Sequence, residues 1–157
     1  MCFSLGDELS FNQETYHVGD YVYIEATERN MDNHVYLIEK LWTGNDGQQM
    51  LFGNWFCRPN ETFHLASRKF LEQEVFKSDV RSPHPLSHIR GRCCVLNVKE
   101  YFKMKPEGFA DKDVYVCESR YSTKARMFKK IKVRFFSFSF LAEVHSVAPS
   151  MFGVGQF

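Results

Sequence analysis

The chain has 157 residues, 44% of them apolar and 25% charged, which is typical of one globular domain with a single core. The first residues lack a basic and apolar signal segment, and no run approaches the roughly 20 apolar residues that span a bilayer. We therefore expect a soluble intracellular protein with no secretory signal. The five cysteines are odd in number and form no C-x-x-C pair, which argues against a disulfide framework or a zinc ribbon and favours buried reduced thiols.

The net charge of +1 hides a strong asymmetry along the chain. Residues 1–79 carry 6 Lys and Arg against 13 Asp and Glu, whereas residues 80–134 carry 14 against 5. Such a distribution can build one basic face that suits nucleic acid or an acidic protein surface. Alternatively, the two halves interleave in space and neutralise each other.

The first half of the chain alternates in strand fashion. This alternation predicts strands over 21–26, 35–42 and 50–58, with a hairpin turn at 44–47 between the last two. Over 62–77 the spacing of Leu65, Lys69 and Glu72 fits one face of a helix, and 74–77 looks like a short strand. Because Pro83 and Pro85 fall in the next segment, we expect a loop over 78–88.

The second half continues with short strands. We expect a buried strand over 93–98, a segment of no clear period over 99–105, and strands over 113–121 and 127–133. About seven short strands with little helix predict a mainly β fold: a twisted antiparallel, partly closed barrel with irregular loops and a few short helices. We assign 1–134 to this single domain. Residues 135–157 are expected to form a Phe-rich C-terminal strand and a loose tail.

Six segments, in this order and at these spacings, resemble the bromo-adjacent homology (BAH) domain family. They are 16–24, 38–42, the W-F-C-R-P-N-E-T motif at 55–62, and 74–78, 89–93 and 117–121. The resemblance covers about 15–132. It implies a barrel-like β fold and a non-catalytic interaction module of nuclear chromatin proteins, whose partners are histones or proteins of remodelling and replication complexes. Some members of the family read methylated histone tails, and others bind nucleosomes or partner proteins.

The resemblance also implies where a methyl-lysine would bind. In members that read it, the Trp of this motif and the acid six residues later contribute, and these positions match Trp55 and Glu61. Two further aromatic positions of the family hold His34 and Ser78 here. Because such a cage needs two to four aromatic faces around the cation, half of it is missing.

Other side chains bear on this region. Tyr36 or Tyr23 could replace a missing cage residue only if the backbone presents that tyrosine differently from the family pattern. We therefore count Tyr36 with Trp55, Glu61 and His34 as candidate peptide-binding residues. The alternative for Trp55, which we favour, is a packed structural tryptophan beside Pro59. For Arg58 we expect a structural ion pair with Glu61 or Glu74.

A basic run near the end of the domain is a second candidate site. Its cations of one strand parity are Lys124, Arg126, Lys130, Lys132 and Arg134. One strand face of this kind suits a DNA backbone or the acidic surface of a histone octamer. The alternative is a solvated outer face that protects the strand from aggregation.

Motifs for catalysis are missing from the sequence. The pair His84-x-x-x-His88 is interrupted by Pro85 and cannot offer the helical spacing of a zinc site, and no Gly-rich phosphate loop or nucleophile elbow is present. We therefore expect no enzyme activity, cofactor, metal, membrane contact or small-molecule substrate. The favoured hypothesis is a nuclear protein–protein interaction module that docks on a nucleosomal or chromatin-associated partner. The alternatives are binding to the DNA or nucleosome backbone through 124–134, and methyl-lysine reading with an incomplete cage.

Overall fold

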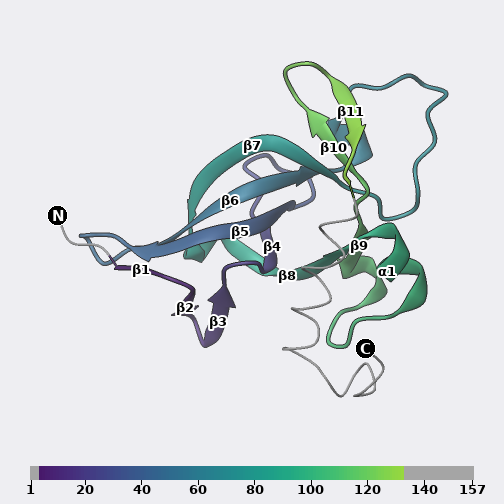
Figure 1. Ribbon diagram of the computed structural model, residues 1–157. Helices are drawn as coiled ribbons and strands as arrows, with labels where there is room; N and C mark the ends of the chain where they lie inside the picture. Colours follow the sequence, from purple (N-terminus) through teal and green to yellow (C-terminus); the bar gives the residue numbers. More distant parts are fainter. Residues whose placement is uncertain (1–3, 133–157) are drawn as a thin grey trace.

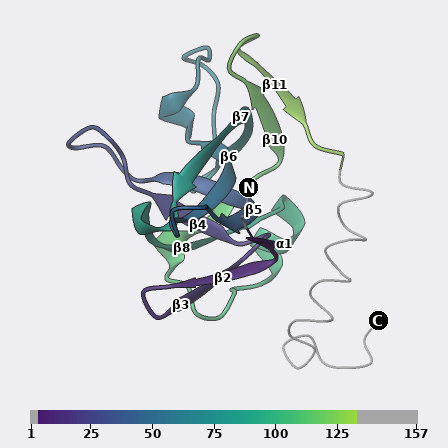
Figure 2. The ribbon, with the colours of Figure 1, turned by 90° about the vertical axis from the view of Figure 1, so that its left-hand side faces the viewer.

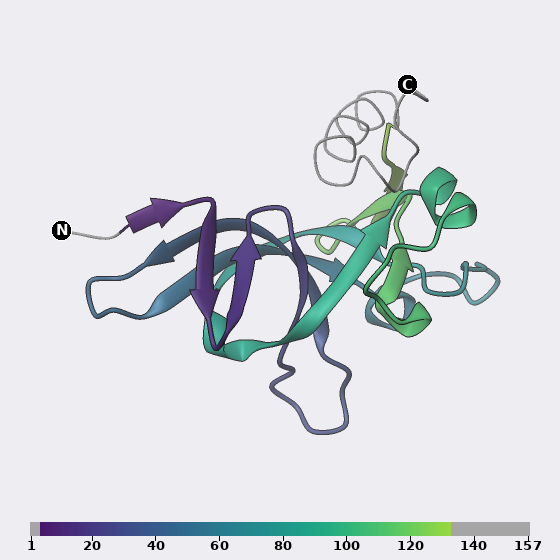
Figure 3. The same ribbon diagram turned by 90° about the horizontal axis from the view of Figure 1, so that it is seen from below.

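The computed structural model describes residues 4–132 (Figure 1). A nine-stranded sheet has the order β11-β10-β7-β6-β5-β4-β8-β9, with β1 paired to β5, and a separate β2–β3 hairpin lies beside it (Figures 1 and 3). The strands are β1 (Ser4–Gly6), β2 (Glu8–Phe11), β3 (Glu14–His17), β4 (Tyr21–Ile24), β5 (His34–Thr43), β6 (Gln49–Cys57), β7 (Phe76–Pro85), β8 (Ile89–Leu96), β9 (Val114–Val116), β10 (Ser119–Ser122) and β11 (Met127–Lys130). The short helices are η1 (Pro59–Glu61), η2 (Leu86–His88), α1 (Val98–Lys103) and η3 (Asp111–Asp113).

The mainly β fold is confirmed, as a strongly curved sheet that does not close fully into a barrel (Figures 2 and 3). Most neighbours are antiparallel, as expected, but β10 runs parallel to β7 and β9 runs parallel to β8. The single strand expected over 113–121 is divided into β9 and β10. The chain pairs with β8 as far as Val116 and then crosses to pair with β7, which lies toward the other end of the strand order. The segment between them, Cys117 and Glu118, bridges the open side.

The β5–β6 hairpin is the centre of the sheet. Its predicted turn is confirmed: Gly47 has a φ of +82°, and Asp46 Oδ1 accepts the Gln48 N–H at 3.0 Å. Tyr36 lies opposite Trp55 in the register, and Leu37 lies opposite Asn54. Because neighbouring side chains on a strand point to opposite faces, β5 and β6 supply both faces of the sheet with core residues.

Each face of this hairpin has its own core. One cluster contains Tyr36, with Trp55 packed against it. Another contains Phe56, with Leu37 and Tyr21 packed against it. Trp55 and Phe56 are adjacent in the sequence and therefore belong to different environments.

The loop predicted over 78–88 is wrong, because Phe76–Pro85 forms the long strand β7. Pro83 pairs with Phe52 and Pro85 with Met50 on β6. On its other side β7 is bonded to β10 only at Lys77 and Ser78, so the proline-containing half is a sheet edge. An edge strand accepts proline where the missing N–H faces away from the ladder.

The helical spacing over 62–77 does not correspond to a helix in the structure. Residues 62–73 contain turns instead of a helix, and Leu65, Lys69 and Glu72 all face solvent. The helix α1 lies instead within 98–103, where no period was visible. Its first turn is fixed by Asn97, whose Oδ1 accepts the Glu100 N–H at 2.9 Å.

Several expectations cannot be compared with the structure. The Phe-rich strand over 135–140, the tail after it and Arg134 lie outside the described residues. No helix within 4–132 is long and apolar enough to cross a membrane.

Candidate functional site

The four candidate peptide-binding residues lie together at one end of the β5–β6 hairpin. His34 and Tyr36 are on β5, Trp55 is on β6, and Glu61 ends the short helix η1 that follows β6. We call this cluster the Trp55 site. The turn at Pro59 brings Glu61 back toward β5, where its carboxylate lies 3.3 Å from Nδ1 of His34.

The Glu61 carboxylate of the Trp55 site is already engaged by neighbouring groups. The Glu61 carboxylate accepts the Arg58 backbone N–H at 2.7 Å, and its other oxygen lies 3.3 Å from Nδ1 of His34. The rings of His34 and Trp55 meet edge to face, with centroids 6.0 Å apart. The His34 side chain is 25% exposed and that of Glu61 is 12% exposed, so this carboxylate is reachable only in part.

Trp55 is built into the core. It packs against the Tyr36 cluster and also against a second cluster made of Cys57, Phe76 and Tyr121. Its indole N–H is buried and has no acceptor among the described residues. These contacts favour the structural interpretation of this tryptophan.

The remaining cage positions offer no aromatic face. Ser78 is buried and its hydroxyl accepts the Val80 N–H at 3.0 Å. Tyr36 is buried between strands, where its hydroxyl lies 3.3 Å from Ser82 Oγ. Tyr23 points elsewhere, since its hydroxyl donates to Asp113 at 2.7 Å.

The expected ion pair of Arg58 with Glu61 or Glu74 is not formed. The guanidinium instead donates to the hydroxyl of Tyr115 at 3.4 Å and lies 5.8 Å from the centre of that ring. Glu61 is engaged by the backbone of Arg58 rather than by its side chain. The orientation of η1 therefore depends on a main-chain contact that side-chain types do not reveal.

The basic run does not form one strand face. Lys124 and Arg126 lie in the turn before β11, and Arg126 has a positive φ of 54° that takes it out of strand geometry. Lys130 is on β11, 3.9 Å from Glu118, and Lys132 follows the strand. Alternation within β11 alone cannot collect these four cations on one side.

An exposed apolar patch beside the Trp55 site was missed from the sequence. Phe63 is 63% exposed and Leu65 is 76% exposed. The Arg126 guanidinium lies 5.1 Å from the centre of the Phe63 ring. Phe63, Leu65 and Arg126 line one shallow recess, and we call them the loop–hairpin patch. Because Leu65 was interpreted as part of a helix face, its exposure was not foreseen.

The cysteines of the described region are buried or partly buried and unpaired. Burial raises the pKa of Cys57 to about 12 and the pKa of Cys94 and of Cys117 to about 11, so these thiols stay protonated near neutral pH. Within residues 4–132 no group of His, Cys, Asp and Glu has the geometry of a metal site.

The chain resembles known proteins over most of the described region. A family model, the BAH domain, matches residues 14–132. The chain is 37% identical over 115 residues to chromatin structure-remodeling complex subunit rsc1 of Schizosaccharomyces pombe, and 32% identical over 126 residues to subunit RSC2 of Saccharomyces cerevisiae. These matches cover 73% and 80% of this chain but only 14% of each relative.

The fold agrees with a solved structure. The crystal structure of the yeast Rsc2 BAH domain matches with a TM-score of 0.75 and 31% identity, covering 84% of this chain and 56% of that one. Each of the six segments that carried the resemblance includes part of the curved sheet that holds the Trp55 site. The chain therefore belongs to the BAH domain family.

Proposed function

We propose that this BAH domain is a non-catalytic module of a nuclear chromatin-remodelling subunit, and that it docks on a nucleosomal or chromatin-associated protein. A likeness to the first BAH domain of polybromo, a subunit of a SWI/SNF-type remodeller, is part of this proposal. Its support is the similarity to subunits of chromatin structure-remodeling complexes in two yeasts. Because the chain spans 14% of those subunits, the assembly that it joins is also proposed.

The observation that carries protein docking is the loop–hairpin patch. Phe63 and Leu65 expose large apolar side chains directly after the motif that ends at Glu61 and Thr62, with the Arg126 guanidinium over the Phe63 ring. Apolar side chains grouped beside cations and a carboxylate are typical of a protein interface, whereas a phosphate backbone gains nothing from them.

Binding to the DNA or nucleosome backbone remains the second candidate. Lys124, Arg126 and Lys132 are exposed and carry positive charge toward solvent. Two features weigh against DNA binding. The Arg126 guanidinium lies over the Phe63 ring, and Lys130 forms an ion pair with Glu118. The cations are therefore mixed with apolar and acidic groups rather than aligned along a backbone track.

Methyl-lysine reading is the third candidate. Trp55 offers a face, but its neighbours are a histidine edge and a serine instead of two more aromatic rings. Cation–π attraction from one ring contributes about 0.5–1 kcal/mol at an exposed site, too little to select a methylated side chain alone.

The test is binding of the whole chain to histone octamer, with variants of exposed residues that leave the core intact. The double variant Phe63→Ser and Leu65→Ser should lower octamer affinity about tenfold or more, the size expected for a docking hot spot. Phe102→Ser on α1 is the matched control, because Phe102 is 68% exposed and lies outside the patch. Equal octamer affinity in wild type and double variant would remove the patch from the interface.

A further inference from the structure

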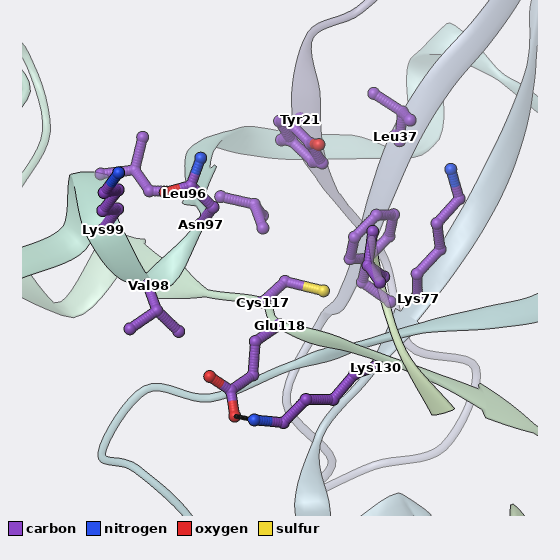
Figure 4. A pocket seen from close by; sticks show the side chains of 13 residues that line it. Tyr21, Leu37, Lys77, Leu96, Asn97, Val98, Lys99, Cys117, Glu118 and Lys130 are labelled. Atoms are coloured by element: carbon purple, nitrogen blue, oxygen red, sulfur yellow. Dashed lines mark ion pairs between the residues drawn. The ribbon is translucent and has the colours of Figure 1, made fainter. Parts of the chain in front are cut away.

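The open side of the sheet contains a cavity that the proposed function does not use. It has a volume of about 470 Å³ and lies between the β8–α1 junction and the chain that leads into β10 and β11 (Figure 4). Its apolar lining includes Tyr21, Leu37, Phe56 and Val95. We call it the Phe56 groove; it lies on the face of β6 opposite Trp55.

Aromatic packing makes the floor of the groove rigid. The rings of Tyr21 and Phe56 meet edge to face with centroids 5.4 Å apart, and Leu37 packs against the same cluster. Figure 4 shows the Cys117 sulfur pointing toward this floor. The groove is thus a preformed apolar recess that needs no opening of the core.

The rim of the groove is positively charged. Lys77, Lys99 and Lys130 line it together with a single carboxylate, Glu118, whose oxygen lies 3.9 Å from Lys130 Nζ. Lys77 and Lys99 stand on opposite sides of the recess (Figure 4), and neither forms an ion pair within residues 4–132. Two ammonium groups beside an apolar floor therefore form no ion pair within the described residues.

The surroundings of Lys77 disfavour its positive charge. On β7, Lys77 pairs with Phe56 of β6 on one side and with Arg120 of β10 on the other. Burial lowers the pKa of Lys77, and the nearby Arg120 lowers it further. A carboxylate placed in the groove would relieve both effects, whereas a second cation would worsen them.

We propose that the Phe56 groove binds an extended peptide segment of a partner protein in which a large apolar side chain lies next to carboxylates. The apolar side chain fills the recess over Phe56, and the carboxylates meet Lys77 and Lys99. Nucleic acid lacks the apolar group, and a basic histone tail has the wrong charge for this rim. The segment 133–157 of the chain itself carries one acidic side chain, Glu143, and so does not supply acidic side chains for both Lys77 and Lys99.

The Phe56 groove and the loop–hairpin patch are lined by different residues, and the groove suits an acidic segment rather than a basic one, so its ligand goes beyond the proposed function. The two are separable by experiment. A groove variant should leave octamer binding unchanged, and the Phe63→Ser and Leu65→Ser double variant should leave acidic-peptide binding unchanged.

The test is fluorescence anisotropy with the 157-residue chain and short labelled peptides. The probe has the central sequence Glu-Phe-Asp-Leu-Glu flanked by Gly and Ser; one control replaces Phe and Leu by Ala, and another replaces the acids by Lys. Only the first peptide should bind. Lys77→Met should lower its affinity about tenfold, the loss expected for one charge-assisted contact, and Lys99→Met should act in the same direction.

Lys129→Met is the matched control, since Lys129 is an exposed cation of β11 that does not line the groove. Unchanged affinity in both groove variants, or no binding of the acidic peptide, would overturn the proposal. A chain with Phe136, Phe138 and Phe140 changed to Ser that binds the peptide at least about tenfold more tightly would also overturn it, because the occupant would then be the chain itself.

Discussion

The Trp55 site and the Phe56 groove lie on opposite faces of one strand, and they differ in what is left unused. In the Trp55 site the carboxylate of Glu61 already accepts the Arg58 N–H and faces His34, and the tryptophan is packed into two clusters. In the groove, apolar side chains line a cavity of about 470 Å³, and Lys77 and Lys99 form no ion pair among the described residues. The recognisable motif therefore marks a place where the tryptophan is packed and the carboxylate is engaged, whereas the cavity on the other face carries no motif.

Trp55→Ala should give the largest effect, because it tests whether the Trp55 site is structural. Removing a large ring that supports two clusters should lower the free energy of unfolding by about 3 kcal/mol. The measurement is urea unfolding, with Phe102→Ala as the control, whose exposed ring should change stability by less than about 0.5 kcal/mol. A Trp55→Ala variant as stable as wild type that loses only octamer binding would make this residue a ligand contact instead.

Lys77→Met should separate stability from binding on the groove side. The substitution keeps the length of the side chain and removes an ammonium that burial disfavours, so the free energy of unfolding should rise by about 0.5–1 kcal/mol while acidic-peptide affinity falls. A loss of stability would show that Lys77 has a favourable partner in the folded chain and would weaken the contrast between the two faces.

The stability difference between wild type and Lys77→Met should also depend on pH. The pKa of Lys77 is lowered by folding, so the folded chain carries its penalty wherever the ammonium is protonated, including neutral pH. As pH rises through this lowered pKa toward the unfolded value of about 10.4, wild type should gain stability relative to Lys77→Met. Unfolding series of both chains from neutral to alkaline pH measure the change, and a constant difference would contradict it.

Asp79→Asn should give the smallest effect, on the hairpin that holds the exposed cations. Asp79 accepts hydrogen bonds from the Thr123 hydroxyl at 2.7 Å and the Thr123 N–H at 3.1 Å, and these bonds lower its pKa. A depressed carboxyl pKa stabilises the fold above the unfolded value of about 3.9 and loses that effect as pH falls below it. Because Asp79 is exposed, the loss should stay below about 1 kcal/mol and should vanish in acid.

The central hairpin and its turn were predictable, because alternation over 35–42 and 50–58 and the Gly-rich turn between them are local signals. β7 was not, since Pro83 and Pro85 normally end a strand and only the arrangement of neighbours shows that they lie on an edge. Likewise α1 is too short to reveal a period, and the Asn97 cap rather than an apolar stripe sets where it begins.

The Trp55 site could be predicted from the sequence, whereas the Phe56 groove could not. Trp55 and Glu61 are six residues apart and share a motif, so a resemblance could place them together. The groove is lined from β4, β5, β6, β7, β8 and the chain around Glu118, positions separated by long stretches of sequence. Only the pairing of β10 with β7 and of β9 with β8 brings them round one recess.

The most direct test of the central claim, that this domain docks on protein rather than on a phosphate backbone, is one salt titration. The whole chain is titrated with histone octamer and, separately, with duplex DNA, at low and at physiological ionic strength. We predict that octamer binding persists at physiological salt and that any DNA binding falls steeply, as release of counterions requires. Tight DNA binding at physiological salt together with no octamer binding would contradict the account.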